Sequence, residues 1–328
     1  MTASVVANKK GVALLVVLWV TVVLTILVNM FMVMVRTEAE GISNYKQETD
    51  TYYLARSGVY LAIQTLLKEA SDEDPAAKVS NASGWKRDGR SRIVSMTKGS
   101  VTIRVMDESG KIGINQSQRP ELVRVLWALG VKGVEKDTIA DAILDWRDEN
   151  NLHHLNGAED DYYAALSPPY GAKDGPLDTV DELLWVKGVT PEIFFGSREI
   201  DETSTFGMTD VFTVYNDAKR VNINTASLGV LLSLPGVDAA TAQRLIEARA
   251  RGPIQNMADF SAASGKLSPN ISKYIRFNSR GIYSIEATGR LAESPIAHSM
   301  KATVQIEGKG QYRILYWKDQ TRARGGAV

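Results

Sequence analysis

The sequence predicts a mixed α+β protein in which a long N-terminal helix packs on an antiparallel sheet and a large helical domain interrupts that sheet. Three observations support this prediction. An uncharged apolar stretch near the N-terminus continues without proline into an amphipathic segment. Segments with the alternating pattern of half-buried strands occur on both sides of a long central region. The central region itself has helical patterning.

The apolar stretch Val12–Val35 contains 24 residues without a charge and follows Lys9, Lys10 and Gly11. As a helix rising about 1.5 Å per residue it would be roughly 36 Å long, enough to cross a hydrocarbon core of about 30 Å. It is longer than the apolar core of a secretory signal peptide and lacks a small-residue cleavage site after it. We therefore expect a single membrane anchor with a cytoplasmic N-terminus, because the lysines precede it. A plain signal anchor stays open as an alternative.

After the anchor, residues 36–70 place apolar side chains mostly at three- and four-residue steps, which predicts that the same helix continues as an amphipathic segment. A polar loop is expected over 69–92. The strands are expected at Ile93–Met96, Val101–Val105, Ile282–Gly289, Ala302–Ile306 and Tyr312–Trp317. Strands on both sides of a helical middle imply one sheet with an insertion. The sheet domain is assigned to 71–118 and 280–320, and the inserted helical domain to 119–279.

Composition excludes several functional classes. The 328 residues carry 38 basic and 38 acidic side chains, so the formal net charge of zero argues against a general polyanion binder. There is no cysteine, which removes disulfides and thiol chemistry. With three histidines, a metal site built on imidazole is not expected.

The inserted domain contains a weak internal repeat, in which a helix ends in a hydrophobic segment with glycine and a second helix follows. The three occurrences are Leu126–Val131, Leu183–Val189 and Leu231–Val237. The third, within 221–260, resembles a helix-hairpin-helix, a module best known for binding DNA without sequence preference. In DNA-binding versions, backbone N–H groups at the hairpin hold a phosphate.

In this chain Asp238 stands where such hairpins carry their second glycine, and a carboxylate there repels phosphate while capping the next helix. A packing role is therefore favoured. Binding to DNA through Gly236 and Arg244, with Arg249 and Arg251 nearby, stays open as the alternative.

Acidic residues form a second cluster in the inserted domain. Asp141, Asp145 and Asp148 follow helical steps of four and three, and Glu159 and Asp160 come shortly after. Crowded oxygen ligands suit Ca²⁺, and we name Asp145, Asp148, Glu159 and Asp160 as candidate ligands. A solvated acidic loop is the alternative. A hydrolase with paired carboxylates is disfavoured, because the sequence identifies no acid–base partners.

The glycine before the apolar stretch and the long continuous helix resemble the N-termini of type IV pilins and type II secretion pseudopilins. In those families a dedicated peptidase cuts after such a glycine and the new N-terminus is methylated. By this resemblance residues 1–11 are a leader, cleavage follows Gly11, and Val12 is the first mature residue.

The family usually carries a glutamate at mature position five, which is Val16 here. That glutamate is thought to neutralise the terminal ammonium of the subunit above. A subunit with none above it would bury an unpaired carboxylate, which costs several kcal/mol. Its absence, the length of the chain, and the VNINTAS (residues 221–227) and Leu234–Gly236 segments resemble the K-type minor pseudopilins of type II secretion.

This resemblance implies a type IV pilin-like fold with an inserted helical domain, and a structural protein rather than an enzyme. The implied role is to initiate or cap a periplasmic pseudopilus in protein export. The implied partners are other minor pseudopilins, the inner-membrane secretion platform and exported proteins. The C-terminal domain would be periplasmic, and the family implies calcium in the inserted domain. The runner-up function is that of a membrane-anchored DNA-binding protein.

Overall fold

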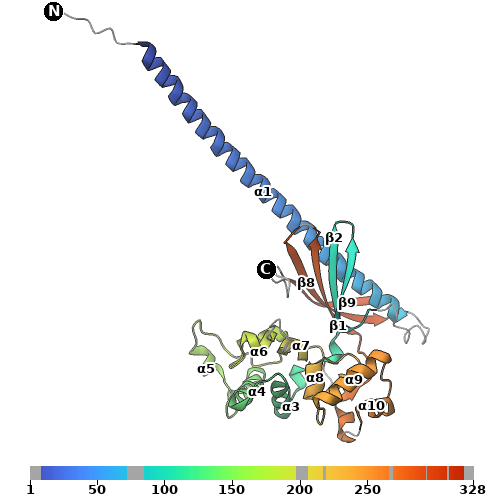
Figure 1. The fold of residues 1–328 in the computed structure, drawn as a ribbon. Helices are drawn as coiled ribbons and strands as arrows, with labels where there is room; N and C mark the ends of the chain where they lie inside the picture. The colour runs from blue at the N-terminus through green and yellow to red at the C-terminus, as the bar shows by residue number, and fades with distance from the viewer. Residues whose placement is uncertain are drawn as a thin grey trace, which may run out of the picture.

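The computed structural model describes residues 9–71, 85–196, 206–216, 219–265, 269–292, 294–308 and 310–320. Residues 1–8 of the expected leader and 72–84 of the expected polar loop lie outside the described residues. A long helix, α1 (Lys9–Ser71), leads to a sheet, and a helical domain lies at the end of that sheet farther from the N-terminus (Figure 1).

The sheet has five antiparallel strands in the order β1-β2-β7-β8-β9. The strands are β1 (Asp88–Met96), β2 (Gly99–Asp107), β7 (Ile282–Leu291), β8 (Ala297–Gly308) and β9 (Gln311–Gln320). β2 pairs directly with β7, with Ile103 opposite Ala287, although more than 170 residues separate these strands in the sequence. The prediction of one sheet interrupted by an insertion is therefore confirmed. β1 begins at Asp88, within the segment expected to be loop.

The C-terminal half of α1 packs on one face of the sheet. The buried residues of α1 include Ala55, Val59 and Ile63, and they meet alternate residues of β2, β7 and β8. Two glycines allow this close approach. A Cβ on Gly58 would lie 2.4 Å from Val101, and a Cβ on Gly289 would lie 2.5 Å from the carbonyl oxygen of Thr51 in α1. The buried stripe differs in part from the expected one, because Ile42, Tyr45, Tyr53 and Tyr60 are exposed.

The inserted domain has its own hydrophobic core, which runs in sequence from Ile114 to Ile275. Its α-helices are α3 (Arg119–Ala128), α4 (Gly133–Arg147), α5 (Asp160–Ala164), α6 (Pro191–Phe195), α7 (Met208–Val211), α8 (Leu228–Ser233), α9 (Ala239–Arg251) and α10 (Met257–Ser264). The 3-10 helix η1 (Glu108–Gly110) lies at the entry to the domain. The other 3-10 helices are η2 (Ile114–Gln116), η3 (Val180–Trp185) and η4 (Pro269–Lys273). Its short parallel strand pairs are β3 (Ile112–Gly113) with β4 (Phe212–Thr213), and β5 (Val221–Asn222) with β6 (Ile275–Arg276).

A buried polar network joins the two domains. Asp107, at the end of β2, accepts hydrogen bonds at Oδ2 from Asn222 Nδ2 (2.9 Å) and Thr225 Oγ1 (3.2 Å). Asn216 Nδ2 donates to the carbonyl oxygen of Lys111 (2.8 Å). Because an unpaired buried polar group is costly, these contacts hold the helical domain in a defined position relative to the sheet.

Candidate functional site

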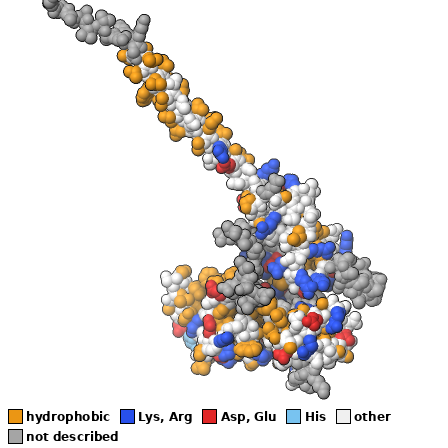
Figure 2. Space-filling model, in the orientation of Figure 1, with side chains coloured by type: hydrophobic (Ala, Val, Ile, Leu, Met, Phe, Trp, Pro, Cys, Tyr) orange, Lys and Arg blue, Asp and Glu red, His pale blue; other side chains and the backbone are white. Residues whose placement is uncertain are grey.

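The N-terminal half of α1 is long and apolar enough to cross a membrane. It contains a window of mean hydropathy 2.7, none of which is buried within the chain, and apolar side chains cover it (Figure 2). Its polar side chains bond back to the helix. The hydroxyls of Thr21 and Thr25 donate to the carbonyl oxygens of Leu18 and Thr21 (2.7 Å each), and Asn29 Nδ2 donates to that of Thr25 (2.8 Å). These groups therefore need no partner outside the helix.

The candidate processing residues, Gly11 and Val12, lie in the first turn of α1. Val12 and Val16 are both exposed on the isolated chain. A carboxylate at position 16 would therefore lie in the apolar part of the helix, where only another subunit could pair it.

The acidic cluster assembles where α4 ends. Asp145 has a fully buried side chain, and it accepts hydrogen bonds from the backbone N–H of His154 (3.1 Å) and from the His154 ring. Asp148 follows as the residue that ends α4, with Oδ1 accepting from Asn150 Nδ2 (2.7 Å). The potential ligand atoms of Asp145, Asp148 and His154 lie within 4.8 Å of one another. Gly157 makes room for the cluster, because a Cβ there would lie 1.8 Å from Asp145 Oδ2.

Glu159 is the residue of this region that most clearly lacks a partner. It is 2% exposed, and neither of its carboxyl oxygens has a hydrogen-bond partner. Burial, together with the charges of Asp145 and Asp148, raises the pKa of Glu159 to about 7. A buried carboxyl facing two other carboxylates requires either a proton or a cation. These residues therefore fit a hard divalent cation.

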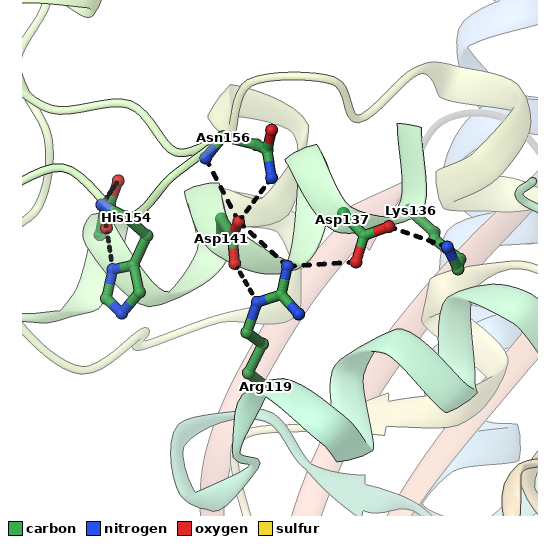
Figure 3. A network of polar contacts seen from close by, with 7 residues as sticks. Arg119, Lys136, Asp137, Asp141, His154 and Asn156 are labelled. Carbon is green, nitrogen blue, oxygen red and sulfur yellow. Dashed lines mark hydrogen bonds and ion pairs between the residues drawn. The ribbon is translucent and has the colours of Figure 1, made fainter. Parts of the chain in front are cut away.

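The other acidic residues have structural partners. Asp141 lies on α4 between Arg119, whose Nε donates to Oδ1 (2.5 Å), and Asn156, whose Nδ2 donates to Oδ2 (3.0 Å) (Figure 3). Burial disfavours its charge, but these hydrogen bonds outweigh burial and lower the pKa of Asp141. Asp160 is exposed, and its Oδ1 accepts from the backbone N–H of Ala172 (2.8 Å). The structure thus brings Asp145 and Asp148 together with His154. Glu159 lies near enough for the charges of Asp145 and Asp148 to raise its pKa, whereas Asp160 holds a neighbouring loop.

Sequence reasoning missed His154 and Asp174. His154 belongs to the cluster although a site with imidazole was not expected, and Asp174 contributes to the raised pKa of Glu159. Asp174 has a φ of 53°, an uncommon conformation for a residue other than glycine. No periodic signal in the sequence could have found these residues, because irregular loops bring them to the cluster.

The three expected hairpins are present, each with a glycine at positive φ: Gly130 (88°), Gly188 (84°) and Gly236 (78°). The helical segment before Gly188 is the 3-10 helix η3 rather than an α-helix. In the third hairpin Asp238 caps α9, and its Oδ1 accepts from Thr241 N–H (2.8 Å). The hydrogen bonds from Thr241 lower the pKa of Asp238, so a carboxylate occupies the place where a phosphate would bind.

Two arginines of this hairpin, Arg244 and Arg249, bond within the domain, whereas Arg251 is exposed. Arg244 donates to Thr241 Oγ1 (2.8 Å) and to the carbonyl oxygen of Ser264 (2.9 Å). Arg249 donates to the carbonyl oxygens of Ile223 (3.0 Å) and Ala226 (2.6 Å). These contacts favour the packing role of the hairpin over the DNA-binding alternative.

Two models of one family match this chain. Both are described as type II secretion system (T2SS), protein K, and they match residues 104–195 and 221–275. Three relatives with the name type II secretion system protein K match over most of their length. The Pseudomonas aeruginosa relative is 25% identical over 269 residues, covering 77% of this chain and 76% of the relative. The Aeromonas hydrophila relative is 28% identical, covering 74% and 76%.

The chain is similar to the type II secretion system protein K family. A solved structure described as the GspK-GspI-GspJ complex from enterotoxigenic Escherichia coli contains a chain with the same fold. It matches with a TM-score of 0.63 at 16% identity, covering 87% of this chain and 99% of the other.

The two segments that match the protein K models contain the sites described above. The first includes the acidic cluster and the joint at Asp107, and the second includes Asn222, Asn224 and the α8–α9 hairpin. Asn224 bridges three segments of this domain. Its Nδ2 donates to the carbonyl oxygens of Ile254 (2.9 Å) and Phe277 (3.0 Å), and its Oδ1 accepts from Ile254 N–H. The asparagines of the VNINTAS segment therefore serve the fold.

Proposed function

We propose that this protein is the minor pseudopilin at the tip of a type II secretion pseudopilus, where it initiates or caps fibre assembly in protein export. The observation that carries this proposal is the placement of the helical domain. It is fastened by the Asp107 network at the end of the sheet away from the anchor (Figure 1). In a fibre of parallel α1 helices it would occupy the outward end. The work proposed is structural, not enzymatic.

The proposed location is the inner membrane, with a single span over residues 12–35, a cytoplasmic N-terminus and a periplasmic C-terminal domain. The apolar and fully exposed half of α1 supports the span. Lys9 and Lys10 before it support the orientation.

The proposed partners are the I-type and J-type minor pseudopilins of the same system. Support comes from the solved relative, which was crystallised as a complex with GspI and GspJ and has the same fold. Contacts with the inner-membrane secretion platform and with exported proteins belong to the same proposal.

Crosslinking along the fibre tests the tip position. A photocrosslinker would be placed at the exposed residue Trp127 of the helical domain in the full-length protein. Because no subunit lies above a tip subunit, this position should give no crosslinks to the major pseudopilin. Crosslinks from the anchor half of α1 to the minor pseudopilins should persist. Detection of this chain at many levels along the fibre would contradict the proposal.

We also propose that the acidic cluster binds calcium through Asp145, Asp148 and Glu159, with further oxygen ligands from the neighbouring loops. The two unpartnered oxygens of Glu159 support this assignment. A bound Ca²⁺ would supply the positive charge that three adjacent carboxylates require. The chain itself positions the carboxylates by burying Asp145 against His154 and by leaving no side chain at Gly157.

Thermal unfolding with and without chelator tests calcium binding. Because a ligand that binds only the folded state stabilises it, calcium at 100 times its Kd should add about 2.7 kcal/mol to the free energy of unfolding. Glu159→Gln should remove most of this difference, whereas the exposed Glu135→Gln should retain it. Identical melting curves in calcium and in chelator would assign the cluster to a solvated loop.

A further inference from the structure

We propose that Asn156 is a site of deamidation which the folded chain restrains, and that its reaction opens the loop around the acidic cluster. This chemistry belongs to the loop itself and does not depend on the proposed export function or on calcium. Asn156 is followed by Gly157, and the two form the one asparagine–glycine pair in the sequence.

An asparagine followed by glycine can react with its own backbone. Because glycine has no side chain, its nitrogen reaches the preceding Cγ with little steric hindrance. The Gly157 nitrogen forms a bond to Asn156 Cγ, and the Cγ–Nδ2 bond breaks. Nδ2 leaves as ammonia and takes the proton of the Gly157 N–H. Water then opens the five-membered imide at either carbonyl and leaves aspartate or isoaspartate at position 156, so water is the only co-reactant.

The fold restrains both reacting groups. The Gly157 N–H donates to the carbonyl oxygen of His154 (3.0 Å), so the attacking nitrogen is engaged in a turn. Asn156 Nδ2 donates to Asp141 Oδ2 (3.0 Å), and this bond holds the amide against α4 (Figure 3). Gly157 is also buried. The reaction therefore has to proceed from a locally opened loop, and its rate is reduced by the small fraction of time that the loop is open.

The acidic cluster explains why the chain keeps a reactive pair at this place. A Cβ at position 157 would lie 1.8 Å from Asp145 Oδ2, so the cluster requires glycine there. Asn156 supplies two donors to Asp141 Oδ2, its backbone N–H (3.3 Å) and Nδ2. Each residue is needed for its own contact, and the reactive pair is the consequence of placing them next to each other.

Neither product fits the folded loop. Aspartate at position 156 would place a second carboxylate where Nδ2 now donates to Asp141, and like charges in contact repel. Arg119 does not remove this repulsion, because Asp141 and Asp137 already share its charge. Isoaspartate would add a methylene to the backbone before Gly157, where the chain has no room beside Asp145.

Opening of this loop would also uncover Asp145. His154 lies in the same loop, and its backbone N–H donates to Asp145 Oδ1 (3.1 Å). One reaction at Asn156 would therefore remove the contacts that the loop makes with both Asp141 and Asp145. Because the amide is lost as ammonia, refolding would not restore them.

Mass spectrometry of the unaltered full-length protein tests the site. The protein would be held at mildly alkaline pH in chelator and in water labelled with heavy oxygen, and then digested with trypsin in ordinary water. The tryptic peptide 148–173 contains Asn150, Asn151 and Asn156, so the first two are internal controls. In denaturant, position 156 should take up the label several times faster than the controls. In the folded protein its rate should be lower by about tenfold or more.

Asn156→Asp tests the consequence, because it reproduces one of the two products. Amide hydrogen exchange over residues 150–157 should be faster than in the parent by about tenfold or more. Asn151→Asp adds the same charge to the same loop at an exposed position, and it should stay within about twofold of the parent.

Three results would overturn this proposal. Equal labelling of the three asparagines in denaturant would remove the reactive pair. Equal rates at position 156 in the folded and unfolded protein would remove the restraint. Equal hydrogen exchange in Asn156→Asp and Asn151→Asp would remove the effect on the loop. The first two measurements use the unaltered chain, so they decide the site even where Asn156→Asp does not fold.

Discussion

The surroundings of the buried Glu159 carboxyl show which groups the acidic cluster lacks. Its oxygens lack partners, and its neighbours Asp145 and Asp148 are also acidic. Asp141, one turn before Asp145 on α4, has the opposite environment because Arg119 and Asn156 satisfy it. Two carboxylates on one helix therefore have different environments: Asp141 is paired with Arg119 and Asn156, whereas Asp145 is paired with His154 beside the unpartnered carboxyl of Glu159.

We predict that the metal-free protein loses stability as the pH rises towards neutrality. The pKa of Glu159 is about 7 in the folded chain, against 4.5 for an ordinary glutamate. Between these values the folded state holds a proton that the unfolded state releases. The free energy of unfolding should therefore decrease from about pH 4.5 to about pH 7, by up to about 3 kcal/mol from this group.

Urea unfolding in chelator at several pH values measures this effect. Glu159→Gln should flatten the profile over this pH range relative to Glu135→Gln, which changes an exposed residue. An unchanged profile in Glu159→Gln would assign the pH dependence to other groups. Excess calcium should also flatten the profile of the parent protein, because the cation replaces the proton.

At the scale of elements, α1 is one uninterrupted helix whose two halves have different surroundings. Its first half is apolar on all sides and exposed, and its second half buries one stripe against the sheet. Exposed side chains at Ile42, Tyr45 and Tyr53 continue beyond the apolar segment. This exposed face is available to other subunits.

Processing at the start of α1 is the prediction that belongs to this helix. Cleavage after Gly11 should leave Val12 as a methylated N-terminus in a host that contains the peptidase. Gly11→Leu should leave the leader attached, because the peptidase of this class cuts after glycine. Mass spectrometry of the purified membrane protein distinguishes the two forms. An intact Met1 start in the unaltered protein would refute this prediction.

At the scale of the molecule, the main feature is the helical domain inserted between β2 and β7. The chain leaves the sheet after β2 and returns in β7, which pairs with β2, so the helical domain is added without breaking the sheet. Asp107 and Asn222 then fasten the two domains together. These contacts hold the helical domain at the end of the sheet away from the anchor, where in the proposed fibre it would block a further subunit.

Val16→Glu tests the tip model at this scale. It would introduce the carboxylate that other pseudopilins carry, but a tip subunit has no ammonium above it to pair with that charge. A buried unpaired carboxylate costs several kcal/mol. We expect impaired membrane insertion or pseudopilus assembly, measured by secretion and by the amount of membrane-inserted protein. Assembly equal to that of the parent would remove the electrostatic argument and leave the steric one.

Local pattern was sufficient to predict the long helix, the five strands of the sheet and the three hairpins, although not the start of β1 or the 3-10 geometry of η3. The uncharged segment, the alternating strands on either side of a helical region and the glycine-containing hairpins each depend on a few adjacent residues. The resemblance to K-type minor pseudopilins added the pilin-like fold and the family. The extent of the buried stripe on α1 was predicted less well, because periodicity alone does not show which face the sheet covers.

Tertiary structure decided which side chains meet. His154, Asp174 and the unpaired state of Glu159 became visible only when loops distant in sequence closed around the end of α4. Sequence periodicity predicts secondary structure and which positions are buried. Whether a buried polar side chain has a hydrogen-bond partner is decided only when the whole chain has folded.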